Sequence, residues 1–244
     1  MTMNTLLLGL LLTSFAADAS PSAADVRASH PALADKIDDL QPKKNRAGKY
    51  YFPGHHLTAP EAQVLLVDRL LSGRDAVAVQ VALAYALDGD HRLPWSTIKR
   101  QPADVRAALL AGYKRHGKAD AVEALSGGLE DDSEAVRFEA ARLLGHRPDL
   151  KSERLVKGLK RGLSAETIDL RWASVRALSW RGDPGSFDAI KPLLADPDAK
   201  VRGAAVRALG VLDKARAKAL PEVAALANDP NRHVQRAFRS LRRD

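Results

Sequence analysis

The chain has 244 residues, a formal net charge of +8 and 45% hydrophobic residues, with only 5% aromatic residues. This length allows one elongated repeat domain or one to two compact domains, and the basic excess favours acidic partners, anionic headgroups or nucleic acid without choosing among them. The absence of cysteine excludes disulfides, thiol nucleophiles and cysteine-ligated zinc sites.

The first segment, residues 1–19, has the pattern of a signal peptide. An apolar run from Leu6 to Leu12 precedes Ala17-Asp18-Ala19, which offers the small-x-small pattern that a signal peptidase cleaves. The run is shorter than the roughly 20 apolar residues of a membrane span. One feature departs from the pattern, because residues 1–5 carry no lysine or arginine. We expect an exported protein, periplasmic or secreted; the alternative is an apolar N-terminal helix docked on the fold.

The next segment, residues 20–58, is interpreted as a linker that contains proline and glycine and is partly disordered. Its apolar residues are few and are not spaced for a helix. The segment ends in the densest aromatic stretch of the chain, from Tyr50 to His56. We expect this stretch to cap the first helical repeat by covering its open apolar end, rather than to bind a ligand.

From residue 59 to residue 244 the pattern is helical. Glu61–Leu71 and Ala76–Leu87 carry apolar residues three and four positions apart, and clusters of proline, glycine and aspartate then recur at short intervals. No useful length of sequence alternates apolar and polar residues with a period of two, so no sheet is expected.

An internal repeat is the strongest signal in this helical part. Residues 196–210 read DPDAKVRGAAVRALG, residues 131–145 read DDSEAVRFEAARLLG, and residues 170–178 read LRWASVRAL. We use the first large apolar residue of each copy as an anchor from which positions are counted; the anchors are Val79, Val105, Val136, Leu170, Val201 and Val234. Their spacings of 26, 31, 34, 31 and 33 residues suit two short helices with their turns.

This repeated pattern resembles the HEAT repeat family, and within it the PBS-lyase HEAT-like subgroup, over residues 59–244. The resemblance implies an all-α fold, an α-solenoid of about six HEAT-type helix pairs that form a right-handed superhelix. It also implies a ladder in which the arginine after each anchor pairs with an aspartate of the preceding turn, with Asp132, Asp169 and Asp198 as candidates. In the third copy, Asp196 is expected to cap the second helix and Gly210 to end it in a left-handed conformation.

The candidate partner-binding residues lie at positions +2 and +6 from the anchors. At 100° per residue these positions fall at about 200° and 240°, opposite the apolar stripe, and in a HEAT stack they should line the concave surface. Large aromatic residues and arginine at such places are typical of binding hot spots. The alternative is that the arginines are merely solvated and the aromatic residues fill gaps between repeats. The predicted partner-binding residues are Phe138, Arg142, Trp172, Arg176 and Arg207.

Motifs for catalysis, cofactors and metals are missing from the sequence. The seven histidines show no His-x-x-x-His spacing, and His55-His56 is at best a weak metal site. Neither a phosphate-binding glycine-rich loop nor a Gly-x-Ser-x-Gly elbow is present. We therefore predict no catalytic residue, no cofactor, no metal site and no enzymatic activity.

The favoured function is a non-catalytic scaffold or adaptor of the cell envelope, which binds an acidic or extended protein partner on its concave helical surface. We expect no membrane span, and the sequence leaves the oligomeric state open. One alternative is a nucleic-acid-binding protein similar to base-repair HEAT-like proteins, if the chain is not exported; the net charge, Trp172 and Trp180 would suit it. The other alternative is a lyase-like accessory enzyme, which only the repeat subgroup suggests.

Overall fold

The computed structural model describes residues 21–48, 50–52, 57–87, 93–114 and 118–243. The predicted signal peptide and the pair His55-His56 lie outside these residues. The chain divides into two compact units, one of residues 1–93 with 100–115 and one of residues 94–99 with 116–244. Each unit is described by itself.

The first unit is helical apart from a short hairpin. Helices α2 and α3 pack against α4, α4 packs against α5, and α5 packs against α7 and the second hairpin strand. The two strands pair antiparallel, with Lys43 opposite Tyr51. The elements are α2 (Ala23–Ser29), α3 (Pro31–Asp38), β1 (Lys43–Lys44), β2 (Tyr50–Tyr51), α4 (Pro60–Leu71), α5 (Val77–Ala86), α7 (Ala103–Ala111) and η1 (Gly112–Lys114).

The linker expected over residues 20–58 differs from the structure. Residues 23–38 form two helices, because Ser22 and Asp25 make a reciprocal capping box and Pro31 begins the second helix. Val26 and Ile37 are almost fully buried against α4. The hairpin is likewise a small departure from the expected absence of strands. Of the aromatic stretch predicted to be a cap, Phe52 is buried and β2 lies beside α5, while residues 53–56 are outside the described part.

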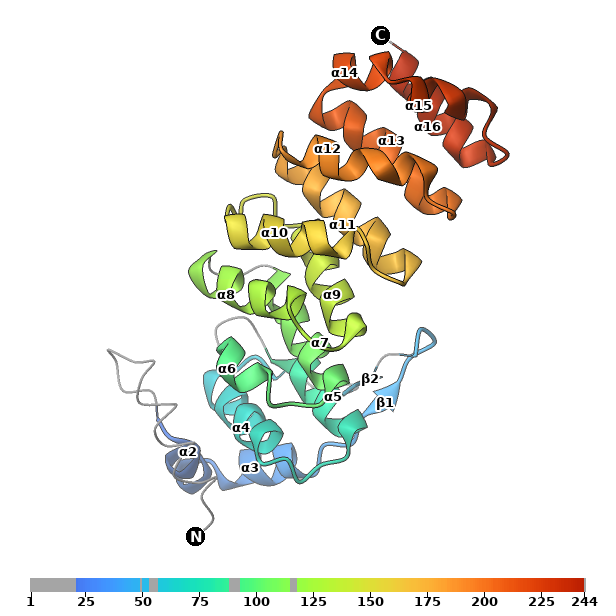
Figure 1. Cartoon of the computed structure of the whole chain (residues 1–244). Coiled ribbons are helices and arrows are strands. Elements are labelled where there is room, and N and C mark those ends of the chain that lie inside the picture. The colour runs from blue at the N-terminus through green and yellow to red at the C-terminus, as the bar shows by residue number, and fades with distance from the viewer. Residues whose placement is uncertain (1–20, 49, 53–56, 88–92, 115–117, 244) are drawn as a thin grey trace. The chain divides into compact units, whose positions relative to one another are not determined.

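The second unit is a stack of helix pairs. Each second helix packs against the next one, α9 on α11, α11 on α13 and α13 on α16, while the first helices α8 and α10 pack on each other. Figure 1 shows this order within the unit. The described elements are α6 (Trp95–Ile98), α8 (Lys118–Leu129), α9 (Glu134–Leu144), α10 (Glu153–Gly162), α11 (Ile168–Arg181), α12 (Ser186–Ile190), η2 (Lys191–Ala195), α13 (Ala199–Leu212), α14 (Lys214–Ala219), α15 (Pro221–Ala225), η3 (Leu226–Asn228) and α16 (Arg232–Arg242). The predicted all-α solenoid is confirmed.

Helix α13 shows how the sequence builds this stack. Its buried residues recur at three- and four-residue spacing, and most are small, so α11 and α16 can approach it closely on both sides. A buried leucine such as Leu209 contributes about 1.5–3 kcal/mol, so stability is summed along many modest contacts. The stripe consists of Val201, Ala204, Ala205, Ala208 and Leu209.

The expected ends of α13 need two corrections. The N-cap is Asp198, whose carboxylate accepts the Lys200 N–H, and not Asp196. The helix also continues past Gly210 to Leu212, and Gly210 is not in a left-handed conformation. A β-carbon at Gly210 would lie 2.7 Å from Cδ1 of Leu241, so this glycine allows α16 to approach. The left-handed glycine cap occurs instead at Gly182, after α11.

Candidate partner-binding surface

The arginines at position +1 form a ladder, but with different acceptors from those expected. The guanidinium group of Arg171 donates to both carboxylate oxygens of Asp196, at 2.8 and 3.0 Å. Arg202 binds Asp229 at the same two distances. These aspartates belong to the following repeat. The preceding turn contributes only backbone carbonyls, which accept from Nη1 of each arginine. The predicted acceptors Asp169 and Asp198 are therefore wrong for these two arginines, and they contact Lys200 instead. The role of Asp132 stays a prediction.

The ladder pairs are well shielded from water. Asp196 and Asp229 side chains are 3% and 4% exposed, and each also accepts a backbone N–H from its own turn. The hydrogen bond from Arg202 lowers the pKa of Asp229, because it stabilises the carboxylate form. These two arginines are thus neutralised and serve the contact between repeats.

Arg137, the corresponding arginine of α9, has no such carboxylate. Its Nη1 donates to the carbonyls of Asp131 and Asp132, as its counterparts donate to their own turns. The position five residues before the next anchor, occupied by Asp196 and Asp229 in the later repeats, is Ala165 here. Ala165 and Arg137 line a cavity of about 260 Å³.

The arginine at position +6 of α11 lies over a half-buried tryptophan of the same helix. The Arg176 guanidinium stands 4.6 Å from the centre of the Trp172 ring, and Nζ of Lys200 stands 4.5 Å from it. Such cation–π contacts hold the ring in a fixed position. Trp172, Arg176 and Arg207 are called the arginine–tryptophan surface below.

Arg207 lies close enough to Arg176 for their charges to repel. Partial burial, and then the charge of Arg176, lower the pKa of Arg207. A β-carbon at Gly203 would lie 3.6 Å from Nη1 of Arg207, so the guanidinium covers this glycine. In the described part of the chain, neither Arg176 nor Arg207 has a carboxylate partner. The structure therefore leaves two adjacent positive charges on this surface.

Comparison with known proteins supports the assignment of these helix pairs. Residues 187–240 match the family model described as HEAT repeats. Residues 187–240 contain HEAT repeats. The crystal structure of an engineered protein, Northeast Structural Genomics Consortium Target OR329, is similar at 19% identity, with 99% of this chain and 95% of that chain covered and a TM-score of 0.45. No match was found among curated proteins. Membership of the PBS-lyase subgroup stays a prediction.

The other two predicted residues lie on the preceding HEAT pair, in a different setting. Phe138 is half-buried on α9. Arg142 donates to both carboxylate oxygens of Glu139, at 2.7 and 2.5 Å, so its charge is already balanced. Helices α9 and α11 pack on each other, but among the described residues a +6 arginine without a carboxylate partner is found on α11 and not on α9.

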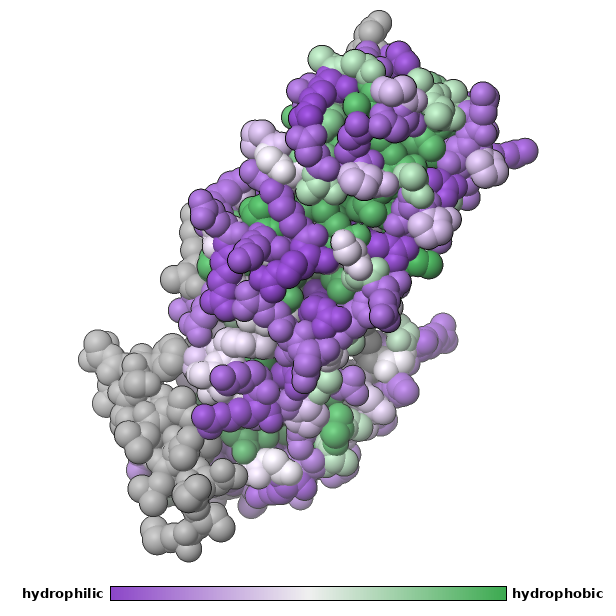
Figure 2. Space-filling model, in the orientation of Figure 1, coloured by the Kyte–Doolittle hydropathy of each residue, from purple (hydrophilic) through white to green (hydrophobic). Residues whose placement is uncertain are grey.

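Two exposed apolar residues on the helices of the arginine–tryptophan surface were not among the predicted partner-binding residues. Trp180 is 61% exposed and Val211 is 67% exposed, the two largest values among the exposed large hydrophobic residues described. Both occupy position +10, at about 280°, one turn beyond the arginines at +6. Extending the predicted rows by one turn would have found them. Figure 2 shows hydrophobic residues among hydrophilic ones over the C-terminal helices on the face it draws.

The HEAT units described here offer binding groups more readily than reactive ones. Within the residues described, no three histidine or acidic side chains are placed to hold a metal ion. None of the helices described is long and apolar enough to cross a membrane. Cations held against aromatic rings suit recognition of carboxylates and apolar side chains.

Proposed function

We propose that this protein is a non-catalytic scaffold of the cell envelope that binds an acidic, extended segment of another protein on the arginine–tryptophan surface. The observation that carries the proposal is Arg176, which stacks on the half-buried ring of Trp172 and lies near enough to Arg207 for their charges to interact. Among the residues that the structure describes, neither arginine has a carboxylate partner. The same two helices carry neutralised arginines at their +1 positions. These two helices thus use their +1 arginines in the contact between repeats and leave their +6 arginines on this surface.

An acidic partner follows from the repulsion between these arginines. A carboxylate placed between Arg176 and Arg207 would relieve the repulsion and form charge-assisted hydrogen bonds, which are about twice as strong as neutral ones. An extended segment could place further side chains on the exposed rings and methyl groups at Trp180 and Val211, on successive repeats. Because the helices already hold these groups, little ordering cost is expected on binding.

The envelope location is supported by the leader pattern of residues 1–19 and by the absence of cysteine, which suits a protein that folds in either redox environment. Mass spectrometry of the protein from its own host should find a chain that starts after Ala19 in the periplasmic or secreted fraction. An uncut chain in the cytoplasm would contradict the location and would favour nucleic acid as the partner.

The binding proposal is tested with a labelled 20-residue peptide rich in aspartate and leucine, whose fluorescence anisotropy reports binding to the full chain. The double variant Arg176→Glu/Arg207→Glu should weaken binding by about a hundredfold, since each charge-assisted contact is worth about 1.5 kcal/mol or more. The matched control Lys99→Glu/Lys214→Glu makes the same charge change at two exposed lysines, one just after α6 and one at the start of α14.

Two outcomes would overturn the binding proposal. If both double variants weaken peptide binding equally, attraction is due to net charge and not to this surface. If the chain instead binds single-stranded DNA more tightly than the peptide, with an affinity that falls steeply as salt is raised, it is a nucleic-acid-binding protein.

A further inference from the structure

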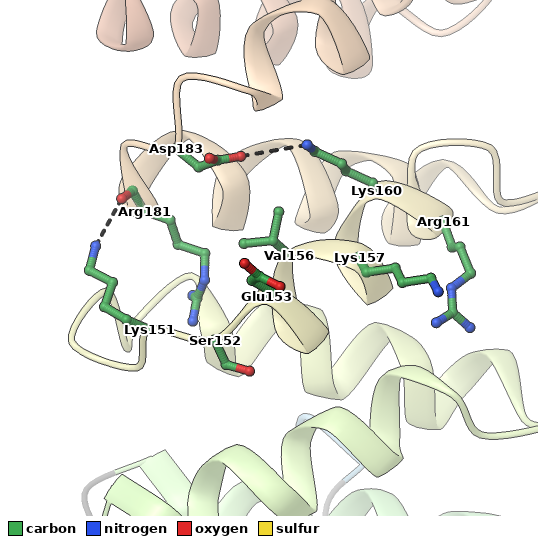
Figure 3. Close-up of a pocket in the computed structure, with 9 residues that line it drawn as sticks. All are labelled: Lys151, Ser152, Glu153, Val156, Lys157, Lys160, Arg161, Arg181 and Asp183. Carbon is green, nitrogen blue, oxygen red and sulfur yellow. Dashed lines mark hydrogen bonds and ion pairs between the residues drawn. The ribbon is translucent and has the colours of Figure 1, made fainter.

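A second candidate site lies away from the arginine–tryptophan surface, where the start of α10 meets the end of α11. This pocket has a volume of about 770 Å³, within the range of small-molecule sites. Figure 3 shows its side chains, with Val156 near the middle and charged groups around it. Two lining residues are acidic, Glu153 and Asp183. Five are cationic: Lys151, Lys157, Lys160, Arg161 and Arg181.

Arg181 is the unusual member of this pocket, because it is a buried cation. Its residue is only 6% exposed. Within the described part of the chain, its guanidinium donates hydrogen bonds to the carbonyls of Leu144 and Leu150 and to no carboxylate. Burial lowers the pKa of Arg181 to about 10, against the opposing charge of Asp149, so it remains charged at neutral pH. A buried charge without a counter-ion is unfavourable.

Arg69, in the first unit, is a buried arginine that has a carboxylate partner, and it serves as a comparison for Arg181. It is 3% exposed and also donates to two backbone carbonyls, those of Ile37 and Leu40. In addition it binds both carboxylate oxygens of Asp75, at 2.8 and 2.9 Å. The two arginines thus hold carbonyls in the same way, but of these two only Arg69 also binds a carboxylate among the residues described.

The carboxylates near Arg181 are engaged elsewhere. Asp149 accepts two hydrogen bonds from Arg147, both at 2.9 Å. Asp183 accepts from the Ser186 hydroxyl at 2.7 Å and pairs with Lys160 at 3.6 Å. The two carbonyls accept from only two of the five N–H groups of the guanidinium. Binding them therefore does not by itself account for an arginine at this position.

We propose that this pocket binds a small oxyanion with at least two negative charges, such as a phosphate ester or a dicarboxylate. The anion would supply the counter-ion that Arg181 lacks, and the exposed Lys157 and the half-buried Lys160 would bind its outer oxygens. Glu153, also in the pocket, opposes anion binding and sets a limit on affinity.

The test uses the full chain with sodium pyrophosphate or citrate as the probe, with ionic strength held constant by sodium chloride. Thermal unfolding should shift upward with at least one probe, and calorimetry should give its Kd. Pyrophosphate alone would indicate a phosphate-bearing ligand, and citrate alone a carboxylate-bearing one. Lys157→Gln/Lys160→Gln should weaken binding about tenfold or more, while Lys99→Gln/Lys214→Gln should leave it unchanged.

Glu153→Gln should change the affinity for the anion in the opposite direction from the lysine variants. Loss of folding could not explain such a gain. Removing this negative charge should tighten binding several-fold in a protein that otherwise unfolds like the natural chain. The proposal is overturned if neither probe stabilises the chain more than sodium chloride, if the two lysine double variants behave alike, or if Glu153→Gln leaves the Kd unchanged.

Discussion

Helices α11 and α13 differ from α9 in which of their arginines the chain neutralises. In α11 and α13 the arginine at +1 is held by a buried aspartate, and the arginine at +6 has no carboxylate in the described structure. In α9 the situation is reversed: within the described residues Arg137 at +1 donates to carbonyls and to no carboxylate, and Arg142 at +6 is paired with Glu139. The same repeat can therefore use its arginines in repeat stacking or leave them on the surface without a carboxylate.

The difference depends on two single positions. Five residues before the following anchor stands Asp196 or Asp229 for the later repeats and Ala165 for α9. At position +3 stands Glu139 in α9 and alanine in α11 and α13. Whether an arginine is neutralised therefore depends on the acidic residues near it and not on the arginine itself.

The largest effect is expected from breaking the ladder between α13 and α16. Asp229→Ala should reduce the free energy of unfolding by about 3 kcal/mol, because it leaves the Arg202 charge without its buried partner. Arg207→Ala, a few residues along the same helix, should cost less than about 0.5 kcal/mol, as surface substitutions do. Urea unfolding of both variants measures the difference. Equal losses of unfolding free energy in the two variants would contradict the distinction between +1 arginines that join repeats and +6 arginines that do not.

The pH dependence of stability checks the same pair. The hydrogen bond from Arg202 lowers the pKa of Asp229 in the folded chain below its ordinary value. Its contribution is therefore fully present above an unfolded pKa of about 3.9 and is lost as pH falls through the lower folded value. Natural chain and Asp229→Asn should converge in stability as pH is lowered below about 4. A constant gap down to pH 2 would contradict a charged pair.

Much of the fold could be predicted from the sequence, because the spacing of the repeat matches the length of two short helices with their turns. The anchors, the apolar stripe and the +2 and +6 rows depend only on spacing along one helix. The helices between Ala23 and Asp38 were missed because their stability comes from packing Val26 and Ile37 on α4, which local apolar spacing does not reveal.

The site was predicted only in part for a similar reason. Trp172 and Arg176 share one helix, so their proximity follows from spacing. The contact of Lys200 with Trp172 and the charge repulsion between Arg176 and Arg207 join different repeats, and the spacing within one helix cannot predict them. The pairing of Arg142 with Glu139 was readable from the sequence, since the other two copies have alanine at that position.

A smaller, stabilising effect is expected from completing the ladder at α9. Ala165→Asp places a carboxylate at the position of Asp196 and Asp229, beside the cavity of about 260 Å³ that Arg137 lines. A new charge-assisted pair should raise the free energy of unfolding by about 1 kcal/mol. Ala165→Asn fills similar space without charge and should gain less. A loss of stability in the aspartate variant would mean that Arg137 cannot reach this position.

The smallest effect on stability, with a change in binding, is expected from making α9 resemble α11 and α13. Glu139→Ala removes an ion pair whose arginine is 34% exposed, so unfolding should change by only about 0.5 kcal/mol. The variant removes this carboxylate from Arg142 and makes the local charge more positive, so affinity for the acidic peptide should rise several-fold. The control Glu166→Ala, at an exposed residue in the turn before α11, removes the same charge but keeps the pair of Arg142 with Glu139. Equal gains in the two variants would show that net charge alone governs binding; a gain confined to Glu139→Ala would show that Glu139 limits the surface at α9.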